Sequence, residues 1–440
     1  MFHHSPDAHA EDDAAHDPYA ALRFHDFRLL LGANLLAGLA QAILSVIVGW
    51  ELYIRTDSAL ALGLVGLVQI VPNVVLSIPA GQYVDRHDQK RIAAISLTLI
   101  AISATILAIL SFNDGPLVAF YACLFLIGVG RAFRSPTQGL LLAAILPHDL
   151  FGNASAWNSS SWQLASIVGP AIGGLGVALV DDAAPVFAVA AGMLGIAALA
   201  ITRLHPRPLH RPVEPVTRDT LLAGVRFIRD TKVLLAAVTL DMVAVLLGGA
   251  TALLPIFAED VLHVGATGLG IMRAAPAVGA ILMSFAIAHK GPFSNAGVTL
   301  LGTVAAFGLA TILFGVSRSF GISLAALGMI GAFDAISVVI RDTMELTFTP
   351  DEMRGRVGSV HYIFIGMSNE FGEFESGLVA AVLGASTAVV LGGIGTLLVV
   401  PVIALLWPEV RRMKRIEAPT VVVATTDPAS NPATSPATAD

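Results

Sequence analysis

The chain has 440 residues, of which 55% are hydrophobic and only 13% are charged. Soluble domains carry about 25% charged residues, so this composition excludes an ordinary soluble enzyme. The formal net charge of -7 gives no support for a nucleic-acid partner. A single cysteine, Cys123, excludes an intramolecular disulfide and a cysteine-based metal site within this sequence.

Twelve apolar runs follow a polar start. Residues 1–27 are rich in His, Asp and Ala and lack the apolar stretch of a signal peptide, so we expect a disordered tail. A helix that crosses a bilayer needs about 20 apolar residues, and open strands cannot satisfy their backbone groups in lipid. We therefore predict twelve membrane-spanning helices, at 29–53, 59–83, 92–112, 117–146, 154–180, 185–202, 233–257, 267–289, 296–316, 321–348, 357–384 and 386–407.

The runs form two groups of six, at 28–203 and 233–407, and the groups repeat each other. A shift of 203 residues places Gly169 on Gly372 and residues 127–128 on 330–331, which indicates a duplication. The linker, 204–232, contains an amphipathic stretch at 217–230 that predicts a helix on the membrane surface. Residues 408–440 are basic and then rich in Pro, Ala and Thr, which predicts a second disordered tail. The expected fold is an all-α membrane protein of two pseudo-symmetric halves with a site between them.

The positive charges predict the orientation. Most of the 25 Lys and Arg residues fall at the tails, in the linker and in the loops on the same side of the predicted bundle. The positive-inside rule then places both termini in the cytoplasm. We expect a multi-pass protein of a bacterial inner membrane.

Several motifs resemble those of the major facilitator superfamily. Residues 81–91, Gly-Gln-Tyr-Val-Asp-Arg-His-Asp-Gln-Lys-Arg, resemble its loop between spans two and three, although Gln89 replaces the usual Arg. Residues 169–174, Gly-Pro-Ala-Ile-Gly-Gly, resemble a pattern of its antiporter branch, and residues 50–64, 130–136 and 372–377 resemble the drug-efflux subgroup that contains the enterobactin exporter. The resemblance implies conformational gating by Gly81, Asp85, Arg86 and Lys90 with Arg356, and an antiporter motif of Gly169, Pro170, Gly173 and Gly174.

Carboxylates within the spans are the candidates for proton coupling, because an intramembrane charge is costly and points to function. Glu370 and Glu373 lie one turn apart on one face of the eleventh span. Two close carboxylates disfavour double ionisation, so at least one is expected to keep its proton near neutral pH. Asp241 of the seventh span is expected to face the same cavity. A purely structural hydrogen-bonding role is the alternative for these residues.

Spans four and ten are expected to line the cavity, as they do in the resembling superfamily. The 203-residue shift pairs Arg131 with Asp334, so we predict that these two charges interact across the cavity or bind an anionic or catechol-like substrate. Arg273 is expected to pair with Glu259 or Asp260, and the stripe of Gln69, Asn73 and Ser77 is interpreted as helix packing. The predicted cavity residues are Asn34, Gln41, Arg131, Arg134, Asn158, Trp162, Asp334 and Arg341.

The predicted function is proton-coupled export of a small amphipathic compound, either a siderophore or a drug. There is no phosphate-binding loop, so ATP is not expected to power the protein directly, and no cofactor or metal is expected. The expected partners are the bilayer, protons and a small molecule, with no nucleic acid, and the expected state is a monomer. A nutrient importer or facilitator is the alternative. A lipid enzyme using Glu370, Glu373 and His361 is disfavoured, because no nucleophile lies at a helix end near them.

Overall fold

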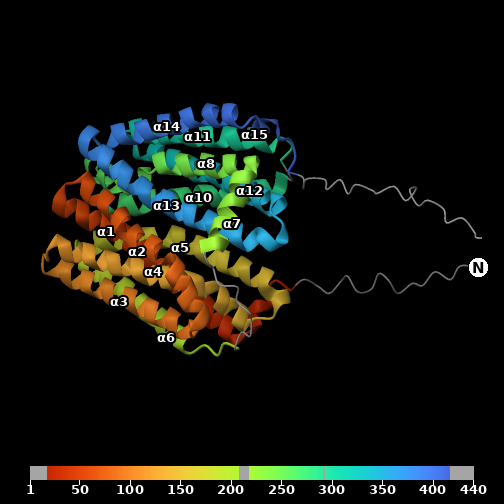
Figure 1. Cartoon of the computed structure of the whole chain (residues 1–440). Coiled ribbons are helices and arrows are strands. Elements are labelled where there is room, and N and C mark those ends of the chain that lie inside the picture. Colours follow the sequence, from red (N-terminus) through yellow and green to blue (C-terminus); the bar gives the residue numbers. More distant parts are fainter. Residues whose placement is uncertain (1–16, 208–217, 291–292, 417–440) are drawn as a thin grey trace, which may run out of the picture.

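The computed structural model describes residues 17–207, 218–290 and 293–416, and the regular structure in these ranges is helical throughout (Figure 1). The expected all-α fold is therefore confirmed. Most of the predicted N-terminal tail, residues 1–16, lies outside the described residues. So do residues 208–217 of the linker and residues 417–440 of the C-terminal tail.

Six long helices form the N-terminal half. Polar residues end or begin several of them. Asp57 and Asp181, both in the left-handed backbone conformation, close the first and fifth helices, and the Asp88 carboxylate accepts hydrogen bonds from the backbone N–H groups of Lys90 and Arg91. The helices are α1 (His25–Thr56), α2 (Ala59–Arg86), α3 (Gln89–Phe112), α4 (Leu117–Ile145), α5 (Phe151–Val180) and α6 (Ala184–Thr202), with η3 (His148–Leu150) before α5.

The C-terminal half repeats this plan, but its first span is broken. The predicted continuous run 233–257 is interrupted after Leu247 by Gly248 and Gly249, and it extends to Val261 through a short 3-10 turn and a π-helical turn. The elements are α8 (Lys232–Leu247), η4 (Ala250–Leu253), α9 (Leu254–Ile256), η5 (Phe257–Val261), α10 (Gly265–Lys290), α11 (Ala296–Val316), α12 (Phe320–Phe348), α13 (Asp351–Leu383) and α14 (Ala385–Leu406).

Eleven segments of the described chain are long and apolar enough to cross a membrane, and α13 is the twelfth long helix. Its 33 residues exceed the length of a span, but Asn369, Glu370, Glu373 and Glu375 make its centre polar. A helix can carry such residues in a bilayer only where they face protein or water rather than lipid. The least apolar span is thus the one expected to border a cavity.

The described residues before α1 and the described part of the linker pack on the helix ends. The Pro18 carbonyl accepts hydrogen bonds from Asn153 and Trp157 of α5, so the stretch before residue 27 that is expected to be disordered includes residues packed on the bundle. The predicted amphipathic helix forms as α7 (Arg218–Asp230), where Ile228 is buried against Val357 and Val360. Part of its apolar face therefore packs on α13 instead of on lipid. Two short elements, η2 (Ala21–Arg23) and α15 (Pro408–Arg412), complete the chain.

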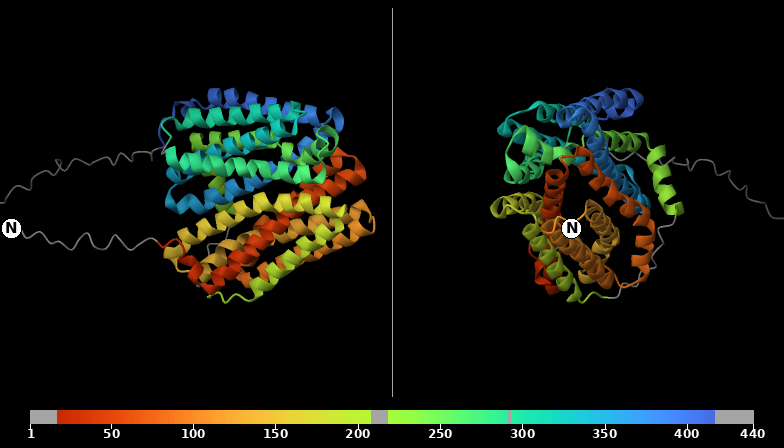
Figure 2. Two further views of the ribbon diagram at one scale, coloured as in Figure 1. Left: turned by 180° about the vertical axis from the view of Figure 1, so that it is seen from behind. Right: turned by 90° about the vertical axis from the view of Figure 1, so that its left-hand side faces the viewer.

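The two halves approach each other most closely at the end of the bundle away from the tails. We name this the far end. The opposite end, where the described chain starts at Asp17 and stops at Ile416, is the terminal end, on the right of Figure 1. At the far end α2 crosses α13 at Gly63 and Gly377, and α5 crosses α10 at Gly174 and Gly270. The end-on view in Figure 2 shows the two halves side by side.

Side chains at these crossings would keep the halves apart. A Cβ atom at Gly174 would lie 2.9 Å from the Cα atom of Gly270, closer than real Cβ contacts come. The Tyr53 hydroxyl of α1 also donates a hydrogen bond to the Asp260 carboxylate of η5, which joins the halves at the same end. The far end is therefore closed by glycine contacts and by a polar bond.

We expect Gly174→Leu to open the far end while each half stays folded. Spin labels on cysteines at Asn113 and Arg318, which are exposed at the far end of the two halves, would report a longer distance in this variant. The background carries Cys123→Ala. Gly192→Leu is the matched control, because a Cβ atom at Gly192 meets nothing within 4 Å. An unchanged distance in well-folded Gly174→Leu would show that this crossing does not set the closure.

Candidate functional site: a charged cavity between the halves

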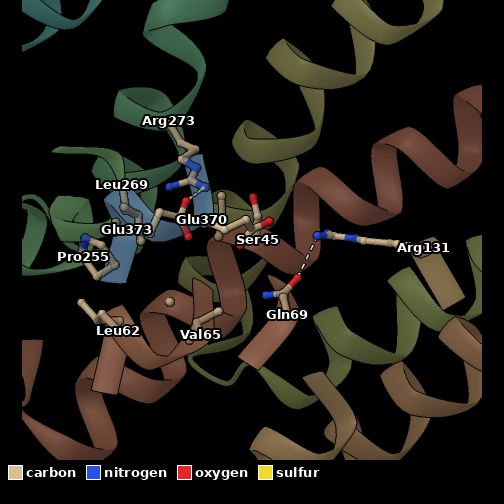
Figure 3. Close-up of a pocket in the computed structure, with 13 residues that line it drawn as sticks. Ser45, Leu62, Val65, Gln69, Arg131, Pro255, Leu269, Arg273, Glu370 and Glu373 are labelled. Carbon is tan, nitrogen blue, oxygen red and sulfur yellow. Dashed lines mark hydrogen bonds and ion pairs between the residues drawn. The ribbon is translucent and has the colours of Figure 1, made fainter. Parts of the chain in front are cut away.

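A cavity of about 180 Å³ lies between the halves, on the inner side of the closed far end. Drug-sized ligands occupy pockets of roughly 300–1,000 Å³, so in this conformation the cavity holds less than such a molecule. Its polar lining comes from both halves: Ser45, Gln69 and Arg131 from one, and Arg273, Glu370 and Glu373 from the other (Figure 3).

The carboxylate pair lies where α13 packs on α2. A Cβ atom at Gly66 would lie 2.7 Å from the Glu370 carbonyl oxygen and 3.3 Å from the Glu373 Oε2 atom. Only a glycine permits this approach, which brings the polar centre of α13 to the wall of the cavity. Glu370 and Glu373 are thus together in the cavity, as the sequence predicts.

Arg273 of α10 lies beside this pair. Its Nη2 atom is 4.0 Å from the Glu373 Oε1 atom, and its Nη1 atom donates a 2.7 Å hydrogen bond to the Thr251 carbonyl of η4. The predicted pairing of Arg273 with Glu259 or Asp260 is therefore wrong for this conformation. Arg273 points inward to the cavity, where the partly buried Glu373 carboxylate can compensate its charge.

Arg131 approaches the cavity from α4 on the other side (Figure 3). Its Nη1 atom donates a 2.8 Å hydrogen bond to the Gln69 Oε1 atom. Asp334, its predicted partner, instead has its Oδ1 atom 3.9 Å from the Arg341 Nη2 atom. The predicted Arg131–Asp334 interaction is therefore wrong here, because each charge finds its nearest polar partner within its own half.

A second charged cluster lies in the C-terminal half, toward the terminal end. Arg341 of α12 forms an ion pair with Asp241 of α8, and both side chains are less than one-tenth exposed. Asp334, by contrast, keeps 49% of its side chain exposed. His361 of α13 is paired with Glu345 of α12 in the same half. Asp241 and Arg341 thus satisfy each other away from the Glu370–Glu373 pair.

Three of the predicted cavity residues meet in the N-terminal half. Asn34 of α1 donates a 3.1 Å hydrogen bond to Asn158 of α5, and its own Oδ1 atom accepts one from Arg134 of α4 at 3.2 Å. The Gln41 Nε2 atom is buried without a partner among the described residues. Trp162 is 61% exposed, so its ring is accessible at the surface of α5.

The motif residues have packing roles that the structure makes visible. A Cβ atom at Gly169 would meet the Cβ atom of Ala42 in α1, and Gly173 lies close to Ile43 of α1. With Gly174 against α10, the motif that begins at Gly169-Pro170 lets α5 contact both neighbours along its length. Pro170 itself is buried within α5.

The loop between α2 and α3 is held by its own half. The Lys90 Nζ atom donates a 2.9 Å hydrogen bond to the Leu204 carbonyl after α6, and partial burial raises the pKa of the Asp85 carboxyl. Arg356, at the start of α13, lies with its Nη1 atom 3.8 Å from the Met353 sulfur, and its carbonyl packs on Gly224 of α7. A gating contact between this loop and Arg356 stays a prediction, as do the gating roles of Gly81 and Arg86.

Several contact residues could not be recognised from the sequence. Gln69 carries no charge, and its stripe on α2 has the same pattern as ordinary helix packing. Tyr53 and Asp260 lie at span ends, where polar residues are common, and Glu345 is close to the end of α12. Gln69 differs from the other residues of the stripe because it lies opposite Arg131 where α2 crosses α4. The position of that crossing is known only from the folded structure.

We expect removal of Arg341 to cost about 3–5 kcal/mol of stability, because Asp241 then stays buried without a partner. Removal of Asp241 should cost less, because Arg341 keeps the Asp334 carboxylate at 3.9 Å. Arg341→Met and Asp241→Asn should each lower the thermal midpoint of the monodisperse protein in detergent. The double variant should recover much of the loss. A double variant whose loss equals the sum of the two single losses would show that the pair is not coupled.

Comparison with known proteins agrees with this architecture. The transmembrane secretion effector family model matches residues 16–426. The chain is 26% identical to the multidrug efflux pump Tap of Mycolicibacterium fortuitum over 76% of the chain and 83% of the relative, and 25% identical to the enterobactin exporter EntS of Shigella flexneri over 88% and 93%. The solved structure of a bacterial homologue of the human lysosomal transporter Spinster, inward-facing and occupied, superposes with a TM-score of 0.71 at 12% identity, covering 91% of this chain and 99% of that one. The chain therefore belongs to the transmembrane secretion effector family of the major facilitator superfamily.

Proposed function

We propose that this transporter exports a small amphipathic compound, a siderophore or a drug, by exchange with protons. The observation that carries the proposal is the position of Glu370 and Glu373 in the cavity between the halves, with arginines from both halves lining the same space. The relatives include a multidrug efflux pump and an enterobactin exporter, which supports an outward direction. The transporter works as a monomer. It needs no cofactor, because the proton gradient supplies its energy.

The mechanism follows from access to the cavity. With the terminal end in the cytoplasm of a bacterial inner membrane, the closed far end separates the cavity from the outside. Substrate enters from the cytoplasm while the carboxylate pair is deprotonated. The halves then separate at the far end, the pair takes up a proton from outside, and the substrate leaves. A negative charge desolvated by closure is costly, so protonation favours return to the closed state. The pair then releases the proton to the cytoplasm, which restores the deprotonated state for the next substrate.

The orientation is testable by labelling single cysteines in intact cells. A cysteine at Asn113, exposed at the far end, should react with a membrane-impermeant maleimide, and one at Arg229 of α7 should react only after the membrane is opened. Both variants carry Cys123→Ala. Rapid labelling at Arg229 in intact cells would reverse the orientation and with it the direction of proton entry.

The coupling role is testable with Glu370→Gln and Glu373→Gln, each of which mimics a protonated carboxyl. Uphill transport of ethidium or enterobactin into inverted vesicles, which corresponds to export from the cell, should fall at least about tenfold, because the variant cannot exchange a proton at that position. Exchange of the same probe at equal pH on both sides should survive in at least one of the two variants. Glu375→Gln, on another face of α13, is the matched control and should export normally.

The outcomes separate the alternatives. If both glutamine variants export uphill with unchanged pH dependence, the proton is coupled at another group. Transport of the probe out of the inverted vesicles, the direction of import into the cell, would favour an importer. Loss of both uphill export and equal-pH exchange in the two variants, with protein levels intact, would place the carboxylates in substrate binding alone.

A further inference from the structure

We propose that Gln69 is a positioning residue for proton coupling: it holds Arg131 on a neutral acceptor, so that the guanidinium group does not form an ion pair with Glu370. This inference rests on the proposed coupling role of the Glu370–Glu373 pair and names a residue that sets how readily the pair takes up a proton. Gln69 itself is uncharged and transfers no proton.

The first step of the argument is the hydrogen bond itself. Arg131 Nη1 donates to Gln69 Oε1 at 2.8 Å, whereas no ion pair of Arg131 occurs among the described residues. Arg131 therefore lines a cavity that contains two carboxylates, yet its bond is to an amide. The arginine Nε atom is buried without a partner, so the guanidinium group has spare donors for a carboxylate.

The second step is the way in which the fold fixes Gln69. Helices α2 and α4 cross at this residue, because Gly128 of α4 allows a backbone approach in which a Cβ atom would lie 2.7 Å from the Gln69 carbonyl oxygen. The same atom would lie 2.6 Å from the Pro72 Cγ atom. The crossing holds the Gln69 backbone against α4, next to Arg131 three residues further along that helix. The amide is thus pre-positioned for the guanidinium group.

The third step is electrostatic. The charged groups that face Glu370 are Glu373 on its own helix, Arg131 from α4 and Arg273 from α10; the remaining lining from α1, α2 and the broken seventh span is uncharged. Arg273 is 4.0 Å from Glu373, which leaves Glu370 without a direct ionic partner among the described residues. Direct contact with Arg131 would stabilise the ionised form of Glu370. The carboxylate would then release its proton readily but would not bind one again.

Two substitutions of similar size should therefore have opposite effects. In Gln69→Leu, Arg131 loses its acceptor and turns to Glu370, so the pH midpoint for protonation of the pair should fall by about one unit. In Gln69→Glu, the new carboxylate binds Arg131 and adds a negative charge, so the midpoint should rise by about one unit. A role in packing alone would not produce shifts of opposite sign.

The midpoint can be measured without a transported substrate. Infrared titration of the purified protein in lipid follows the carboxylic C=O band, and subtraction of the spectrum of the Glu370→Gln/Glu373→Gln variant isolates the pair, with the proton as the only probe. Asn73→Leu, one turn further along α2 and outside the cavity lining, is the matched control and should leave the midpoint unchanged. In an Arg131→Gln background, Gln69→Leu should lose its effect, because that effect acts only through Arg131. Gln69→Glu should still raise the midpoint there, because its own negative charge remains beside the pair.

The results test the role of Gln69 separately from the coupling role of the carboxylate pair. Opposite shifts, with the Gln69→Leu shift disappearing without Arg131, support the inference. Shifts of the same sign, no shift, or a Gln69→Leu shift that persists without Arg131 overturn it, provided that the wild-type pair titrates. If the wild-type pair shows no titrating band, the proposed coupling role fails instead. Should Gln69→Glu fail to fold, the Gln69→Leu variant with and without Arg131 still decides the question.

Discussion

The placement of two carboxylates between arginines of opposite halves is the interaction on which the rest of the structure depends. Charges in a bilayer must be compensated by protein or water, and here charged and polar groups from both halves line the same cavity. Arg273 lies beside Glu373, while Arg131 is held by Gln69. The site is complete only when the halves are close. Any movement that separates them at the far end changes the electrostatic environment of the carboxylate pair.

The fold could be predicted from the sequence because a bilayer leaves few choices. Apolar runs of sufficient length must be helices, and their number and grouping follow from counting. The break in the seventh span could not be predicted in the same way, since Gly248 and Gly249 are as apolar as their neighbours and are common within spanning helices. Their effect on the helix depends on what packs there: a Cβ atom at Gly249 would meet the Gly372 carbonyl of α13.

The site could be predicted only in part, and the reason is geometric. Helical periodicity shows which residues share a face, so Glu370 and Glu373 could be assigned together. The 203-residue repeat shows which residues occupy equivalent positions in the two halves, but equivalence does not mean proximity. Arg131 and Asp334 are equivalent in this sense, and each instead contacts a group of its own half. Distances between helices require the packing, which small residues such as Gly66 and Gly128 determine.

Closure and charge are linked through the same helix face. Gly377 meets Gly63 at the far end, and Glu373 lies four residues earlier on α13, against Gly66 of α2. The helix crossing that closes the far end is therefore continuous with the crossing that covers the carboxylates. Burying a charged carboxylate against a helix backbone is costly, and burying a neutral one costs much less. In the proposed exchange cycle, the free energy of the α2–α13 contact thus depends on the charge of Glu370 and Glu373. Protonation of the pair therefore acts directly on the helix contact that closes the far end, without a further structural element between them.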